Sequence, residues 1–158
     1  MPDVNNIDLK GIVSSVVTNT FETMLNMSIM PAEPDESLSW PRFLAQVGVA
    51  GEAVMGNICL NLDLEGARMI AAAMLGTEED DLEMGEIEDV VGELSNIAGG
   101  SIKSRLCDED LICRLSIPSV TYGSHFKFDT VGYERNERLW FKYEGLIFFV
   151  EVFIKAKK

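Results

Sequence analysis

The stretch Ile87–Leu106 constrains the fold more than any other part of this 158-residue chain. Its apolar residues recur at steps of three and four, which predicts a helix with one buried face. They are Ile87, Val90, Val91, Leu94, Ile97, Ala98, Ile102 and Leu106. A second stripe with the same spacing is polar and contains Asp89, Glu93, Asn96 and Gly100. The rest of the chain must cover the first stripe, and the second needs an explanation.

The same helix contains residues that helices disfavour. Gly92, Asn96, Gly99 and Gly100 together destabilise it by about 3 kcal/mol relative to alanine at the same positions. One explanation is that the glycines allow another helix to pack closely against this one. The other is that they clear space around Glu93 and Asn96, so that the backbone of a partner protein can reach both side chains. The sequence leaves both explanations open.

The composition indicates a globular protein that binds neither nucleic acid nor membranes. Hydrophobic residues make up 47% of the chain, enough for a sizeable core, and the length fits a single domain, residues 1–158. The formal net charge of −13 argues against anionic partners such as nucleic acids and anionic membrane surfaces. The longest apolar run, Leu146–Ile154, is too short to span a bilayer.

Two further features predict a cytoplasmic location. Asp3 and Asp8 precede any apolar run, so the N-terminus does not resemble a secretory signal. The three cysteines, Cys59, Cys107 and Cys113, lack the CxxC spacing of metal and redox sites, which suits a reducing compartment.

The first half of the chain predicts a helix, a hairpin and a second helix. The long helix covers Ile7–Met27, and Pro31 and Pro34 close the segment off. A polar connector, Asp35–Pro41, leads into two strands, Phe43–Val49 and Val54–Leu62, which form a hairpin around Gly51. Helical spacing resumes over Leu64–Leu75, and Gly76 is placed to end this helix.

The second half predicts strands after the central helix. They cover Leu111–Ile117, Val120–Asp129 with a bend, Leu139–Tyr143 and Leu146–Ile154, with a turn at Gly132–Asn136. The last strand is apolar on both faces, so we expect it near the centre of the sheet. Each half opens with a long helix and continues into antiparallel strands, which indicates a duplication. The predicted class is therefore α+β, an antiparallel sheet with long helices packed on one side.

Most kinds of catalytic site are excluded by what the sequence lacks. The single histidine, His125, cannot build a zinc site from histidines, and its spacing from serines matches no nucleophilic triad. Eight acidic residues between Glu78 and Asp89 lack the alternating ligands and glycine of a calcium loop, and they suit the N-terminus of the helix that follows. No metal site and no cofactor of the chain's own is predicted.

One motif remains, on the polar stripe. Asp89 is followed by Glu93 and Asn96, and twenty-two residues later by Pro118. This pattern resembles the motif of the CheC/CheX/FliY chemotaxis phosphatases, in which Asp or Ser precedes ExxN and a distant proline. The predicted order of helices and strands resembles that family over nearly the whole chain. The resemblance therefore implies the duplicated, pseudo-two-fold CheC/CheX-like fold.

The resemblance also implies an activity and a partner. Members of the family hydrolyse the phospho-aspartate of the response regulator CheY. Glu93 would pair with the active-site lysine of a phosphorylated CheY-like regulator, and Asn96 would hold a water in line with phosphorus. The Mg²⁺ belongs to the regulator. We expect Asp89, Gly92, Gly99 and Gly100 to line the partner-binding surface and Pro118 to be a structural part of the motif.

The first helix carries a related pattern in which two positions are exchanged. Ser15 is followed by Asn19 and then Glu22, so an amide stands where the motif has a carboxylate and the reverse. A carboxylate facing the phosphoryl group would repel it, so we expect one working site. In the family, CheX carries one site and CheC and FliY carry two, which makes this chain closer to CheX. Resemblance to CheX further implies a homodimer.

Two alternatives to the enzyme stay open. Glu93 and Asn96 could belong to an ordinary solvated helix face. The chain could also be a binding module without activity, because flagellar motor-switch proteins share this architecture. Such a module would sequester a phosphorylated receiver domain rather than hydrolyse its phosphoryl group.

Overall fold

The computed structural model describes residues 3–128 and 131–157. The helices in this range are α1 (Leu9–Leu25), α2 (Leu64–Leu75), the short 3₁₀ helix η1 (Glu79–Asp81) and α3 (Met84–Asp108). The strands are β1 (Met30–Ala32), β2 (Arg42–Gly51), β3 (Val54–Asp63), β4 (Cys113–Leu115), β5 (Ser119–Gly123), β6 (Arg135–Tyr143) and β7 (Leu146–Ala156).

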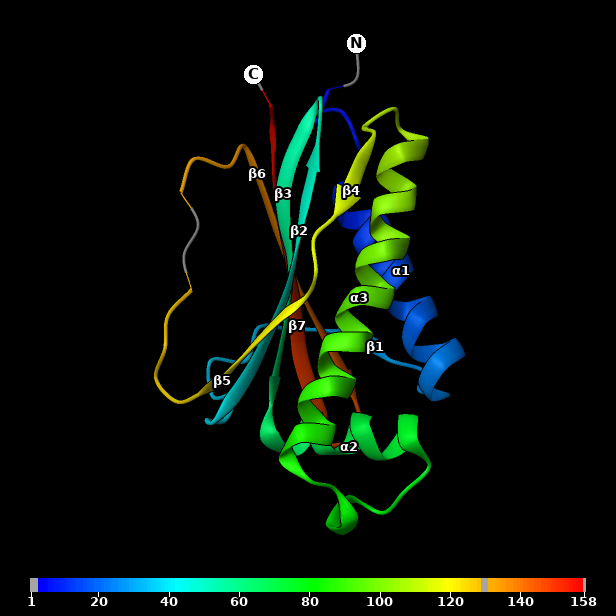
Figure 1. The fold of residues 1–158 in the computed structure, drawn as a ribbon, viewed down its shortest axis with the longest axis vertical. Coiled ribbons are helices and arrows are strands. Elements are labelled where there is room, and N and C mark those ends of the chain that lie inside the picture. Colours follow the sequence, from blue (N-terminus) through cyan, green and yellow to red (C-terminus); the bar gives the residue numbers. More distant parts are fainter. Residues whose placement is uncertain (1–2, 129–130, 158) are drawn as a thin grey trace.

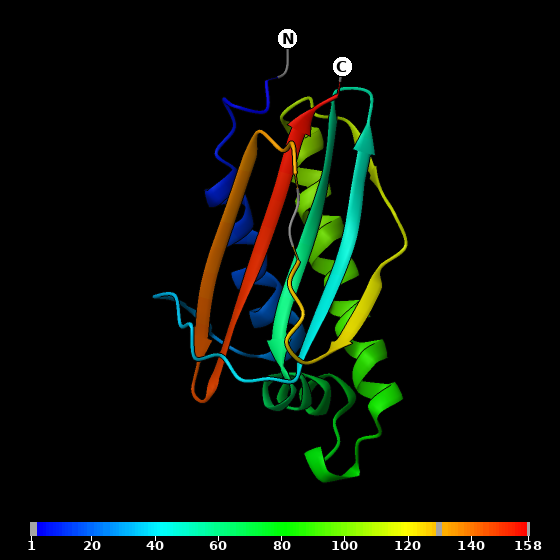
Figure 2. The same cartoon turned by 90° about the vertical axis from the view of Figure 1, so that its left-hand side faces the viewer.

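Within the described residues, the seven strands form one antiparallel sheet in the order β1-β6-β7-β3-β2-β4, and β5 also pairs with β2. Figures 1 and 2 show α1 and α3 on one face of this sheet. This arrangement confirms the predicted α+β class and the central position of the last strand. Because β7 pairs with a strand on both sides, it offers no free edge to a second subunit.

Local signals explain why the elements begin and end where they do. Asp63 caps α2 by accepting a hydrogen bond from the Gly66 N–H at 2.7 Å, and Gly76 ends the helix with φ of 66°. The predicted range Leu64–Leu75 is thereby confirmed. The hairpin of β6 and β7 turns through Glu144, whose φ is 50°, and Gly145. The predicted hairpin around Gly51 is present, with strands slightly longer than predicted. Strand β6 begins at Arg135 rather than at Leu139, so the last two residues of the turn predicted over Gly132–Asn136 belong to this strand instead.

The predictions from the sequence were wrong mainly for short strands. It missed β1, which has three residues, contains Pro31, and pairs with the outer side of β6. The strand predicted over Leu111–Ile117 is reduced to β4, and the one predicted over Val120–Asp129 ends at Gly123. After Gly123 the chain leaves the sheet and crosses the face opposite the helices (Figure 2). Asp129 itself lies outside the described residues.

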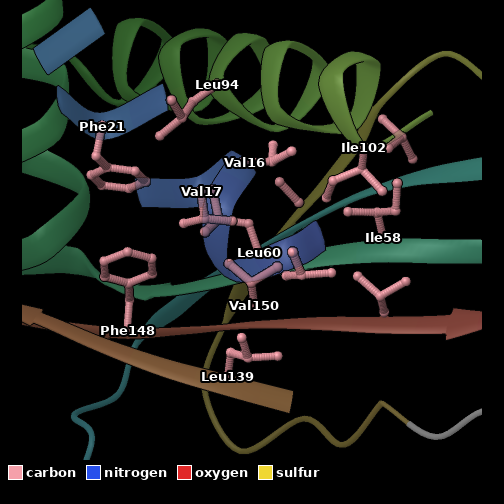
Figure 3. Packing of buried hydrophobic residues seen from close by; sticks show 14 of the residues in the cluster. Val16, Val17, Phe21, Ile58, Leu60, Leu94, Ile102, Leu139, Phe148 and Val150 are labelled. Atoms are coloured by element: carbon pink, nitrogen blue, oxygen red, sulfur yellow. The ribbon is translucent and has the colours of Figure 1, made fainter. Parts of the chain in front are cut away.

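The main core lies between the helices and the sheet. Figure 3 shows Phe21 of α1 above Phe148 of β7, and the two rings stack with centroids 4.7 Å apart. Leu94 and Ile102 of α3 are fully buried in the same core. Phe126 and Phe128, which follow β5, pack with three buried residues on the opposite face of the sheet, namely Leu44, Cys59 and Phe153.

The two halves of the chain exchange their helices. Helix α1 packs against β6 of the second half, whereas α3 packs against β2 of the first half. The strands that follow the helices behave in the same way: β1 pairs with β6 and β5 pairs with β2. Each half therefore contains a long helix, an edge strand and a hairpin in the same order, and α2 lies between the two halves. This is the pseudo-two-fold duplication that the sequence predicts.

Candidate functional site

The site is built on α3, and the capping of this helix explains the acidic residues before it. The backbone N–H of Glu83 donates a hydrogen bond to the Glu86 carboxylate at 3.0 Å, in a capping box. Carboxylates near this end also complement the positive end of the helix dipole. The sheet-facing side of α3 carries the predicted apolar stripe, although Ile97 and Ala98 within it are only half-buried. The helix is therefore firmly seated.

The opposite side of α3 presents the polar stripe, which we call the polar ridge: Asp89, Glu93, Asn96 and Gly100. The first three side chains are exposed, and Gly100 is half-buried. Among the described residues, the side chains of Glu93 and Asn96 make no hydrogen bond and no ion pair. The carboxylate and the amide thus lie one helical turn apart, in solvent, with their hydrogen-bonding capacity unused by the chain itself.

A groove runs beside the polar ridge, between α3 and α1. It encloses about 580 Å³ and is lined by Ser15, Asn19, Asn96, Gly100, Ser104 and Arg105, among others. Asn19 from the exchanged pattern of α1 therefore borders the same groove as Asn96, whereas Glu22 is exposed and does not line it. Sequence reasoning did not single out Ser104 or Arg105. Ser101 follows Ile97 by four residues, and Ser104 and Arg105 follow Ser101 by three and four. This helical spacing would have placed both residues on this side of α3.

Two glycines of α3, Gly92 and Gly99, lie against strands of the sheet. A β-carbon at Gly99 would lie 2.7 Å from Cγ2 of Val47 in β2, and one at Gly92 would lie 3.3 Å from Cγ2 of Val120 in β5. Both glycines are buried. They let the helix approach the sheet closely, so close packing explains them. The element that packs against them is a strand rather than the helix considered from the sequence. Their burial does not favour the expectation that Gly92 and Gly99 line a partner-binding surface, whereas for Asp89 and Gly100 this expectation stays a prediction.

Alanine substitution should therefore change the free energy of unfolding in opposite directions at the neighbouring positions Gly99 and Gly100. Replacing Gly100 adds a β-carbon that meets its nearest neighbour, Cδ1 of Leu115, at 4.0 Å, so the gain in helix propensity should raise the free energy of unfolding by about 0.5–1 kcal/mol. The same change at Gly99 forces a contact with Val47, and we expect a net loss of about 1–2 kcal/mol. Urea unfolding of both variants measures the difference. Equal shifts for the two variants would contradict this packing argument.

Pro118 lies in the connection between β4 and β5, where it is half-buried. This connection follows α3 closely. A β-carbon at Gly99 would lie 3.7 Å from Cδ1 of Leu115, at the start of the connection. A β-carbon at Gly92 would lie 3.3 Å from Cγ2 of Val120, just after it. The connection that contains the motif proline therefore runs along the helix that carries Glu93 and Asn96, although the two are far apart in sequence.

Residues 43–141 match the model of a protein family described as chemotaxis phosphatase CheX. The chain belongs to the CheX family. No curated protein matches the sequence. Within the described residues, no helix is both long and apolar enough to cross a membrane.

Solved structures of other CheX proteins share the fold. The chemotaxis protein CheX from Vibrio vulnificus is 20% identical with a TM-score of 0.82, and the match covers 94% of this chain and 97% of that one. CheX from Desulfovibrio desulfuricans is 24% identical with a TM-score of 0.77, covering 96% and 100%. CheX from Borrelia burgdorferi, solved in a complex with CheY, BeF3 and Mg²⁺, is 25% identical with a TM-score of 0.75, covering 95% and 99%.

Proposed function

We propose that this CheX-family protein hydrolyses the phospho-aspartate of a CheY-type response regulator and so ends its signal. The observation that carries the proposal is the exposure of Glu93 and Asn96, one turn apart on the polar ridge, without partners among the described residues. An isolated amide in mid-helix is unfavourable, because asparagine is a poor helix former and caps nothing there. A role toward a partner explains why it stands at this position.

The chemistry suits an amide rather than a strong base. An acyl phosphate is already reactive, so the main requirement is a water held in line with phosphorus. The Asn96 carboxamide can both accept a hydrogen bond from that water and donate one to it, and it carries no charge that would repel the phosphoryl oxygens. A glutamine positions the attacking water in GTPases in a comparable way.

Glu93 would fix the orientation of the partner. Its carboxylate stands one turn before Asn96 on the same ridge, so a lysine in the active site of the regulator could pair with it while Asn96 enters the phosphorylated cleft. The Borrelia protein was solved with both CheY and Mg²⁺. By analogy, we expect the Mg²⁺ to be held by the regulator, so that this chain needs no metal ligands of its own.

The decisive experiment is a phosphate-release assay. A CheY-type receiver domain is phosphorylated, and its loss of phosphate is followed with and without the protein. We expect acceleration that is catalytic in the added protein. Stable binding of the phosphorylated receiver with unchanged decay would instead identify a binding module that sequesters the receiver.

Removing the charge of Glu93 should weaken the encounter with the regulator. For Glu93→Gln we expect KM for the phosphorylated receiver to rise about tenfold, which corresponds to ~1.4 kcal/mol, because the lysine loses its ionic partner. The turnover rate at saturation should change much less. Steady-state kinetics at low ionic strength separates the two parameters.

The matched control for that change is Glu88→Gln. Glu88 is also an exposed glutamate of α3, but it lies outside the polar ridge. The control removes the same charge from the same helix. An equal rise in KM in both variants would mean that only the overall charge of the protein matters.

A further inference from the structure

The connection between β4 and β5 runs along the part of α3 that carries Asn96, on the side of the two buried glycines Gly92 and Gly99. At the start of the connection, the Leu115 side chain approaches Gly99 and Gly100 of α3. At its end, the Val120 side chain approaches Gly92. Ile117 is midway between Leu115 and Val120, just as Asn96 is about midway between Gly99 and Gly92. The connection therefore brings Ile117 alongside the part of α3 that carries the proposed catalytic amide.

The backbone at this point is held in place. The Ser116 N–H donates to the carbonyl oxygen of Gly48 at 2.9 Å, and the Gly48 N–H donates to the Ser116 hydroxyl at 2.7 Å. The Ser116 hydroxyl in turn donates to the Ile117 carbonyl at 3.2 Å. Pro118 restricts the backbone of Ile117, the residue before it. Ile117 is thus fixed on a tethered connection and cannot easily turn inward.

The side chain of Ile117 is 89% exposed. A single exposed apolar residue is common on protein surfaces and means little by itself. Here the residue belongs to a segment that two hydrogen bonds fix to β2, between Leu115 and Val120, which approach α3 on either side of the level of Asn96. The groove on the other side of the ridge is lined largely by small polar residues such as Ser15 and Ser104. Ile117 therefore offers an exposed apolar contact to a protein that docks over this part of α3.

We propose that Ile117 is a docking contact for the phosphorylated receiver and packs against an apolar side chain beside the phosphorylated cleft of that partner. This rests on the proposed function, which already brings the receiver over Asn96. A stable interface buries about 800 Å² on each partner, more than two side chains can supply. The contact must therefore spread beyond Glu93 and Asn96, and interfaces usually obtain their affinity from buried apolar anchors.

The test compares Ile117→Ser with Val131→Ser. Val131 is also 89% exposed, but it lies in the chain between Phe128 and Tyr133, which pack on the face of the sheet opposite the helices. The probe is a CheY-type receiver domain loaded with beryllofluoride and Mg²⁺, in which beryllofluoride stands in for the phosphoryl group. Affinity is measured by calorimetry, and turnover is measured with the phosphorylated receiver.

We expect Ile117→Ser to bind the receiver about tenfold more weakly and to raise KM by the same factor, with kcat and melting temperature unchanged. Val131→Ser should match the wild type. Unchanged affinity of Ile117→Ser, or an equal loss in Val131→Ser, would overturn the docking contact while leaving the proposed function intact. If the wild-type protein neither binds nor dephosphorylates the receiver, the proposed function fails and this inference fails with it.

Discussion

Asn96→Ala is expected to abolish the acceleration of receiver dephosphorylation while leaving the protein folded. Without the amide, the attacking water loses the group that holds it in line with phosphorus, and only the intrinsic decay of the acyl phosphate remains. We expect a loss of about 100-fold in kcat, which corresponds to ~2.7 kcal/mol of transition-state stabilisation. Because the side chain of Asn96 is exposed and makes no hydrogen bond within the described residues, its removal should not lower the melting temperature.

Asn19→Ala is the matched control for this loss. Asn19 is also an exposed helical asparagine, and it lines the same groove from α1. If α3 carries the working site, this variant should keep at least half of the wild-type turnover. An equal loss in both variants would mean that the two helices act together, against the expectation of one site. Retained activity in Asn96→Ala would remove the amide from the mechanism.

Phe21→Ala should produce the largest loss of stability among single changes in α1. Phe21 is 1% exposed and its ring stacks on Phe148 of β7, which stacks in turn on Phe141 of β6 with centroids 5.5 Å apart. Truncation removes the stacking of α1 on Phe148 and leaves a cavity that the sheet cannot collapse to fill. We expect the free energy of unfolding to fall by about 3–5 kcal/mol, measured by urea denaturation.

Met24→Ala is the comparison within the same helix. Met24 lies three residues after Phe21 and is 46% exposed, so its truncation should change the free energy of unfolding by less than about 0.5 kcal/mol. A loss of similar size in both variants would indicate that α1 is destabilised by any truncation rather than by the loss of its aromatic contact.

The features that the sequence predicts best are those whose cause is local. The bounds of α2 follow from Asp63 and Gly76, which cap the helix from adjacent positions in the chain. The face of α3 that carries Glu93 and Asn96 follows from helical periodicity, because a side chain on the side opposite a continuous apolar stripe must face away from the core.

What the sequence misses depends on contacts between distant segments. Strand β1 is too short to show alternation, and it exists because β6 leaves an edge for it to pair with. The packing of Gly99 against Val47 depends on how α3 lies across β2, which periodicity does not reveal. In the same way, Asn19 joins the groove beside Asn96 only through the packing of α1 against α3. The exposed position of a site residue can thus be predicted, but its neighbours cannot.

The exchange of helices between the halves has a consequence for how such a molecule can exist. Helix α1 covers β6 and α3 covers β2, so each half loses the long helix that covers its hairpin when the other half is absent. An ancestral half would have needed a second copy with which to intertwine, and the present chain resembles such a dimer fused into one polypeptide. Two fragments separated between α2 and α3 would accordingly gain a folded core by complementation and lack one in isolation.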